Sequence, residues 1–405
     1  MYLWLELFLL SSGITARLII PAATAGSGVN LLVVLFIWLA LLVHSVRKFT
    51  NRNQNAKLPN ETITGLSNGV HLLDKTPAPG LPPVLKLLLF LFAGLIVASF
   101  INAPYMFGAF QYLVPWISDL VLFYLVYSLC VQDQRNMTLL LSVFLANAVI
   151  VTLYALYQHF WELPGLAEQI RQNPSLLDMM PDYLRSPAMA RAIAGEPYAT
   201  FLYQNSLGAF LALVIPLFIA LAWMRQKRWP SFAIPDLQSG GWWMWLIVLL
   251  ISLFVLIQTG SKGAILALVF GLGIAGAMLI PSIKRGGGVL ILIGVVAALV
   301  LLVVISRSQM FDSFNVRLGY WEATVKIIKD NPVSGVGLNQ FGNSYLYYKS
   351  AEAGEVQKAH NDYLQIASEM GIPAMLVFLV IWFLILKSIF RPAREPNTTQ
   401  PPPQR

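Results

Sequence analysis

The chain has 405 residues, of which 57% are hydrophobic and only 11% are charged, and its mean hydropathy is +0.67. Soluble domains carry about 25% charged residues, so this composition excludes an ordinary soluble globule. The formal charge of +8 is spread over short loops between apolar runs, which argues against a nucleic-acid-binding face and favours a role in membrane topology.

Long apolar runs recur along the whole chain. A bilayer core about 30 Å thick needs roughly 20 apolar residues per helical span, and the runs lack the period-two alternation of a membrane β-barrel. The sequence therefore predicts an all-α polytopic membrane protein with about ten transmembrane helices. The expected spans are Leu3 to Ile20, Val29 to Val46, Leu85 to Ala103, Phe107 to Val131, Met137 to Phe160, Ser206 to Met224, Trp242 to Thr259, Gly263 to Ile280, Val289 to Ile305 and Ile372 to Phe390.

The topology follows from lysine and arginine residues, which gather in alternate loops. Cytoplasmic loops are enriched in these residues, so both termini are expected in the cytoplasm. Two long segments, 161–205 and 306–371, then lie outside. The first ten residues, MYLWLELFLL, have no positively charged start and are interpreted as a retained span rather than a cleaved signal. The loop 51–83 and the tail 391–405 are rich in Asn, Thr and Pro, as flexible connections are.

The outer segment 306–371 contains two predicted helices. In RLGYWEATVKIIKDNP, apolar residues recur at helical spacing, so we expect an amphipathic helix of about three turns at the membrane surface. In HNDYLQIASEMGIP, a second helix is expected to end at Gly371. The predicted apolar face of the first helix holds Leu318, Trp321, Val325 and Ile328, and one face of the second holds His360, Tyr363, Leu364 and Ala367.

Ionisable residues in this chain have competing interpretations. Asp119 and Glu6 lie inside apolar runs, where they serve either a function or helix pairing. Asp362 and Glu369 share another helix face, where they either orient partners or are solvated at the surface, and solvation is the favoured interpretation. The chain has one cysteine and neither a GxxxxGK[ST] loop nor an HExxH motif, so we expect no metal and no cofactor.

The two blocks RLGYWEATVKIIKDNPVSGVGLNQF and HNDYLQIASEMGIP stand in this order directly before the last span. They resemble the most recognisable part of the O-antigen ligase and polymerase family. RAIAGEPYATFLYQNSLGAFLALVIPL and the turn TGSKGAILAL fit the same family, which commonly has arginine where this chain has Lys262. The resemblance runs roughly from Arg191 to Phe390. We therefore predict N-terminal helices and a first outer loop (1–190), a ligase-like domain (191–390) and a disordered tail (391–405).

The resemblance implies a fold of the membrane glycosyltransferase C type in the bacterial inner membrane, with its site facing the periplasm or exterior. Members of the family transfer a glycan from an undecaprenyl diphosphate-linked donor to an acceptor hydroxyl on a lipid, a growing glycan or a protein. Their reaction needs no metal. The implied partners are therefore the lipid-linked donor, the acceptor and the bilayer.

Transfer from a diphosphate requires cations for the leaving group and a base for the acceptor hydroxyl. His360, whose imidazole titrates near neutral pH, is the predicted base, and Arg317, Arg191 and Lys262 are the predicted diphosphate ligands. Anchoring to lipid headgroups is the alternative role for Arg191 and Lys262. The predicted substrate contacts are Asn361, Tyr363, Trp321 and Asn205.

Two other functions compete with this interpretation. A multi-pass transporter of a small anion such as bicarbonate would place its functional residues at mid-membrane depth, for example at Asp119. A non-catalytic partner in polysaccharide export would not depend on His360. The backbone amides of Gly335 and Gly337 could also bind phosphate, although a plain turn is the simpler interpretation of a lone GxG.

Overall fold

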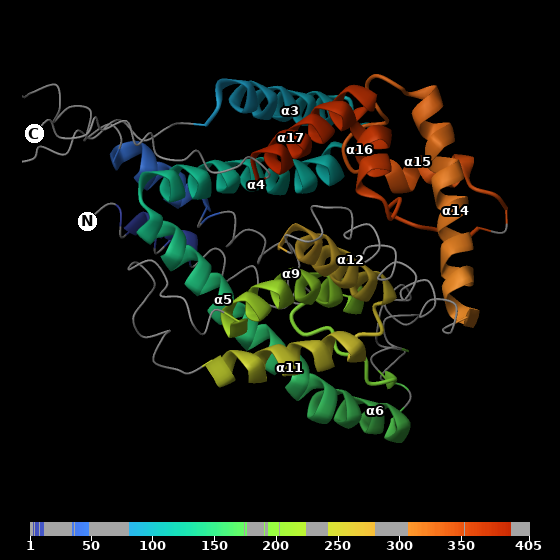
Figure 1. Cartoon of the computed structure of the whole chain (residues 1–405). Helices are drawn as coiled ribbons and strands as arrows, with labels where there is room; N and C mark the ends of the chain where they lie inside the picture. Colours follow the sequence, from blue (N-terminus) through green and yellow to red (C-terminus); the bar gives the residue numbers. More distant parts are fainter. Residues whose placement is uncertain are drawn as a thin grey trace, which may run out of the picture. The chain divides into compact units, whose positions relative to one another are not determined.

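The structure is a computed structural model that describes residues 81–173, 193–201, 203–223, 242–279 and 307–389 apart from residue 352. It also describes parts of 3–11 and 35–47, and residues 175 and 190. The predicted span Val289 to Ile305, the predicted tail and Arg191 lie outside these residues. Within them every regular element is a helix, as predicted from the composition (Figure 1).

Four helical segments in the described part of the chain are long and apolar enough to cross a membrane. These are α3 (Pro83–Ile101), α4 (Met106–Gln132), the continuous run of α5 (Gln134–Tyr157), η2 (Gln158–Glu162) and α6 (Leu163–Gln172), and α9 (Gln204–Trp223). The apolar helices α11 (Trp242–Gln258), α12 (Lys262–Leu279) and α17 (Ile372–Ile389) are shorter. The structure thus supports a membrane protein, while the number of about ten spans stays a prediction.

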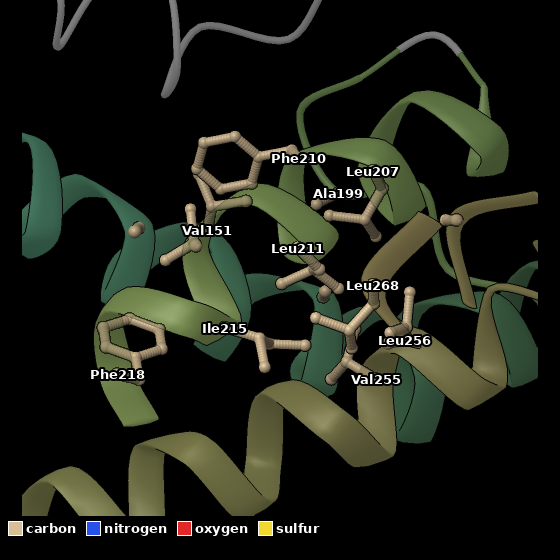
Figure 2. Close-up of a cluster of buried hydrophobic side chains, with 14 of the residues drawn as sticks. Val151, Ala199, Leu207, Phe210, Leu211, Ile215, Phe218, Val255, Leu256 and Leu268 are labelled. Atoms are coloured by element: carbon tan, nitrogen blue, oxygen red, sulfur yellow. The ribbon is translucent and has the colours of Figure 1, made fainter. Parts of the chain in front are cut away.

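The described residues fall into two compact units, one within residues 1–79 and 121–310 and the other within 80–120 and 311–405. In the first unit, α9 packs against α11 and α12 around a core that includes Leu211, Ile215 and Val255 (Figure 2). Gly208 brings α9 close to α12, because a Cβ there would lie 2.6 Å from the Cβ of Ser261. Such small residues let helix backbones approach in membranes, where apolar burial alone does not drive helix association.

Near the N-terminus, the contacts of Glu6 favour helix pairing over a separate function. Its carboxylate is fully buried, 2.7 Å from Nδ1 of His44 and 3.2 Å from a guanidinium nitrogen of Arg47. Both partners belong to the helix Ile37–Arg47. Because a buried charge needs a partner, this arrangement supports helix pairing at Glu6.

The second unit is built on the pairing of α3 with α17, to which α16 (Asp362–Met370) is joined at Gly371 (Figure 1). Phe92 of α3 is almost fully buried, with its ring centroid 5.7 Å from that of Trp116 and 5.6 Å from that of Phe378. Aromatic pairs at such separations contribute beyond their buried area. They connect α3, α4 and α17 into one support for the outer segment.

The first helix of segment 306–371 is longer than the sequence indicated. α14 spans Arg307–Asp330, and it packs through a different face from the predicted apolar one. Ala323 and Ile327 are buried with Phe341 and Tyr345 of α15 (Phe341–Tyr348), whereas two predicted members, Leu318 and Val325, are exposed. Small and branched side chains at 323 and 327 allow the close fit on α15. The location of the exposed face at a membrane surface stays a prediction.

The loop between α14 and α15 is hydrogen-bonded to the last turn of α16. The amides of Val336 and Gly337 donate to the carbonyls of Ser368 and Glu369 at 2.8 and 3.0 Å. The last four carbonyls of a helix have no partner within the helix, so the loop satisfies groups that a buried helix end would otherwise leave unpaired. α16 therefore serves as the base on which the loop is built.

Glycines make this close approach possible. Gly335 and Gly371 have φ of +66° and +86°, values that favour glycine. A Cβ on Gly335 would collide with the Glu369 carbonyl group, and one on Gly371 would collide with the Val333 carbonyl group. The predicted tight path at Gly335 is confirmed, as is the break at Gly371.

We expect Gly335→Ala and Gly371→Ala each to destabilise the protein by about 1–3 kcal/mol, because each adds strain at positive φ and a clash with backbone. Gly319→Ala on α14 is the matched control, since no described residue lies within 4 Å of its Cβ and helices favour alanine over glycine. Thermal unfolding in detergent measures the effect. Equal melting temperatures for all three variants would contradict this role.

Candidate functional site

The sequence predicted that His360 lies on one helical face with Tyr363, and this prediction is wrong. α16 begins at Asp362, and Asn361 is its N-cap, with Oδ1 accepting from the amides of Tyr363 and Leu364 at 3.1 and 3.2 Å. An Asn placed before an apolar run is a strong helix-starting signal, so the helix begins after His360. His360 instead sits in the left-handed region with φ of +52°, a conformation that costs roughly 1–2 kcal/mol for a residue with a Cβ.

Two side chains hold the residue before His360. Trp321 Nε1 of α14 donates to the carbonyl of Ala359 at 3.0 Å, and the amide of Ala359 donates to Oε1 of Gln365 of α16 at 2.7 Å. Ala359 itself is fully buried. Each hydrogen bond contributes about 1 kcal/mol net, so the pair is comparable to the strain at His360.

The imidazole of His360 lies against Tyr320, with ring centroids 5.8 Å apart and ring planes 30° apart. The side chain is exposed, and within the described residues neither ring nitrogen has a hydrogen-bond partner. Partial burial against its neighbours lowers the pKa of His360, and the positive charge of Arg317 lowers that pKa further. The imidazole is therefore neutral near pH 7 and able to accept a proton.

Arg317 is exposed on α14, one helical turn before Trp321. It forms no ion pair with any residue that the structure describes, so its guanidinium is available to an anion, which arginine can bind through two parallel hydrogen bonds. Its positive charge acts on the imidazole of His360 and lowers the pKa of that group. The joint role of Arg317 and His360 in one site stays a prediction.

Glu369 is buried rather than solvated at the surface, with 3% of it exposed. Its Oε1 accepts from Nε2 of Gln365 at 2.7 Å and from the amide of Phe341 at 3.4 Å. Burial raises the pKa of Glu369, while Lys358 and these hydrogen bonds act in the opposite direction. The Lys358 ammonium also lies 3.9 Å from the ring centroid of Tyr112. This contact connects Lys358 to α4.

The sequence also singled out the loop at Gly335 and Gly337 and the side chain of Tyr363. The amides of Gly335 and Gly337 donate to the carbonyls of Asn331 and Glu369, so the plain turn describes this loop and its amides do not face a phosphate. Tyr363 is exposed, with its ring centroid 6.3 Å from that of Phe378. Its contact with substrate, like that of Asn361 and Trp321, stays a prediction.

The other predicted residues belong to the first unit. Lys262 is the half-buried first residue of α12, directly after a turn in which Gly260 has φ of +63°. That turn is closed by Thr259, whose Oγ1 accepts from the amide of Ser261 at 3.2 Å. Asn205 is exposed in the first turn of α9. The start of a helix favours anions, which agrees with a phosphate role for Lys262.

The segment preceding α9 is held by the π-helical turn at the end of α5. Oε1 of the buried Gln158 accepts from the amides of Tyr198 and Ala199 at 2.8 and 2.7 Å, and Nδ1 of His159 lies 2.8 Å from the carbonyl oxygen of Gly195. π-helical turns occur frequently at functional sites. Sequence reasoning did not identify Gln158, because an isolated glutamine in an apolar run gives no sign of its partner.

Comparison with known families matches residues 246–379 to the O-antigen ligase family. The chain carries an O-antigen ligase domain. The matched region runs from α11 into α17, and it includes Lys262, Arg317 and His360 but not Arg191 or Asn205. No curated protein and no solved structure matches the chain.

The O-antigen ligase domain confirms the resemblance on which the sequence interpretation relied. This domain supports a membrane glycosyltransferase of the general O-antigen ligase and polymerase type, with a role in the biosynthesis of polysaccharide and lipopolysaccharide. Within the domain the sequence missed Gln365 and Lys358, and it favoured surface solvation over an orienting role for Glu369. The signal that could have identified these residues is their position, since Lys358 lies two residues before His360 and Gln365 and Glu369 lie on the short helix α16 that follows.

We expect Arg317→Ala to raise the pKa of His360 but to leave it below 6.5, because burial is the larger cause of the lowering. The histidine ring resonances of 13C-labelled protein report the pKa, and His360→Ala assigns the signal among four histidines. Lys329→Ala, which removes an exposed cation at the far end of α14, is the control. An unchanged pKa in Arg317→Ala would show that the guanidinium does not act on the imidazole.

Proposed function

We propose that this protein transfers a glycan from an undecaprenyl diphosphate-linked donor to an acceptor hydroxyl, with His360 as the base. The proposal is carried by an exposed imidazole whose pKa is lowered by partial burial and by the charge of Arg317. Arg317 has no ion pair among the described residues, and both side chains belong to the O-antigen ligase domain. A base whose pKa lies below the working pH is unprotonated and can accept a proton in the transition state.

In the proposed reaction the acceptor hydroxyl gives its proton to His360, and the acceptor oxygen forms a bond to the anomeric carbon of the donor. The bond between that carbon and the diphosphate oxygen breaks, and the diphosphate leaves with the electron pair. Arg317 binds the charge that develops on this leaving group. The protonated imidazole then loses its proton to solvent, so the site returns to its starting state.

Lys262 and Arg191 are proposed as further ligands of the diphosphate, and Asn361, Tyr363, Trp321 and Asn205 as contacts to the glycan or acceptor. The proposal for Lys262 is supported by its place at the start of α12, where helix dipole and ammonium both favour an anion. Lysine provides the charge of an arginine but not its two parallel hydrogen bonds.

The site is proposed to face the periplasm or exterior from the inner membrane, with both termini in the cytoplasm. The support is the basic residues of the short loops, which all fall on the side opposite segment 306–371 under the predicted ten-span topology. The undecaprenyl chain would lie in the bilayer beside the spans, and its diphosphate would reach the outer segment. No metal is needed in the proposed reaction.

His360→Ala is expected to lower glycan transfer by about 10²–10⁴-fold, the usual contribution of a general base, while the protein remains in the membrane. Surface glycan in a strain that lacks the gene and carries the variant gives the first measurement. Lys329→Ala should transfer glycan normally. Full surface glycan with His360→Ala would exclude catalysis by this residue and favour transport or a non-catalytic export role.

Lys262→Ala is expected to reduce transfer by about 10-fold or more, because it removes a cation from the diphosphate, whereas Lys262→Arg should retain transfer. Membranes from the deletion strain, which hold unused lipid-linked donor, serve as substrate for the added purified variants. Lys387→Ala controls for the loss of one lysine, since Lys387 lies in the last turn of α17 over Phe383. Equal transfer by Lys262→Ala and wild type would contradict a diphosphate role.

A further inference from the structure

The backbone that carries His360 is held from two directions. Trp321 of α14 binds the carbonyl of Ala359, and Gln365 of α16 binds the amide of the same residue. The carbonyl belongs to the peptide bond that leads into His360. These two contacts therefore fix the backbone on the N-terminal side of His360, and with it the direction in which the imidazole projects.

Gln365 can hold this amide only in one orientation. Its Oε1 must face the Ala359 N–H, and its Nε2 must then face an acceptor. Glu369 supplies that acceptor at 2.7 Å. A flipped amide would place two donors against each other at Ala359 and two acceptors against each other at Glu369. The carboxylate one turn further along α16 thus fixes the orientation of Gln365.

Glu369 is itself fixed by its surroundings. It is buried, it accepts from the amide of Phe341 at the start of α15, and its main-chain carbonyl accepts from Oγ of Ser99 at 2.8 Å. The charged side chain that acts on it is that of Lys358. The order of contacts therefore runs from a fixed carboxylate through Gln365 to the Ala359 amide and His360.

We propose that Gln365 is a positioning residue for His360, and that Glu369 orients it, so that the last turns of α16 hold the imidazole in its reactive place. This inference rests on the proposed function of His360 as the base. Neither residue touches the reacting atoms. Their effect reaches the chemistry through the left-handed backbone at His360, which has no glycine to relieve its strain.

An exchange of the two side chains tests the proposal. Gln365→Glu keeps an acceptor for the Ala359 amide but sets two carboxylates against each other, so that they hold together only while they share a proton. Glu369→Gln keeps an acceptor for Nε2 of Gln365. In the double variant, the carboxylate now at position 365 accepts from Ala359. The side-chain amide now at position 369 donates to that carboxylate and accepts from Phe341, so every donor again faces an acceptor.

We expect Gln365→Glu to lower kcat by about 10–100-fold, the scale of a misplaced catalytic group, with little change in KM. Its activity should fall further as the pH rises, because the shared proton is lost. Glu369→Gln should stay within about 3-fold of wild type, because the new side-chain carbonyl still accepts from Nε2 of Gln365 and keeps its orientation. The double variant should recover to a similar level and lose the alkaline fall. The assay uses membranes of the deletion strain as the source of donor and acceptor.

The histidine ring resonance of His360 gives a readout that does not depend on transfer. Gln365→Glu should shift this resonance and raise the pKa of His360 toward 6.5, as the ring loses its packing, and the double variant should restore both. Gln169→Leu, at an exposed glutamine of α6, should leave both readouts unchanged. Failure of the double variant to restore the resonance would overturn the positioning role. Restored resonance with transfer unaffected throughout would instead overturn the proposed role of His360 as the base.

Discussion

Glu369 brings a carboxylate into the interior of the second unit, where it is 3% exposed. A buried carboxylate is costly unless hydrogen bonds satisfy it, and here the partners come from different parts of the chain. The amide of Phe341 and the side-chain amide of Gln365 approach the carboxylate, while Ser99 and Gly337 approach the main-chain carbonyl. A helix end, a loop, α3 and α15 are thereby joined at one residue.

This junction explains why the outer segment can carry a strained residue. His360 lies in the left-handed region, a conformation that surrounding contacts must impose. Its neighbour Ala359 is held by Trp321 and Gln365, and Gln365 is oriented by Glu369. In the proposed reaction, Arg317 binds the diphosphate and His360 accepts a proton. The lowered pKa of His360 favours the neutral imidazole that this role requires.

The sequence predicted the class of fold, the apolar spans that the structure describes, and the O-antigen ligase domain. These follow from hydropathy and from residue types within short blocks. It misplaced His360 on α16, because the period of apolar residues extends past the N-cap, and only the capping role of Asn361 marks the true start. It also treated Glu369 as solvated, since burial of a carboxylate depends on partners such as Ser99 that lie far away in the chain.

The central claim is that Arg317 and His360 form one site for the diphosphate end of a lipid-linked glycan. A cryo-EM map of the protein with undecaprenyl diphosphate, the leaving group of the proposed reaction, tests it most directly. The account predicts diphosphate density against the Arg317 guanidinium, with the His360 imidazole facing the terminal phosphate. Density bound only among the spans, with Arg317 and His360 both without contact to it, would contradict the account.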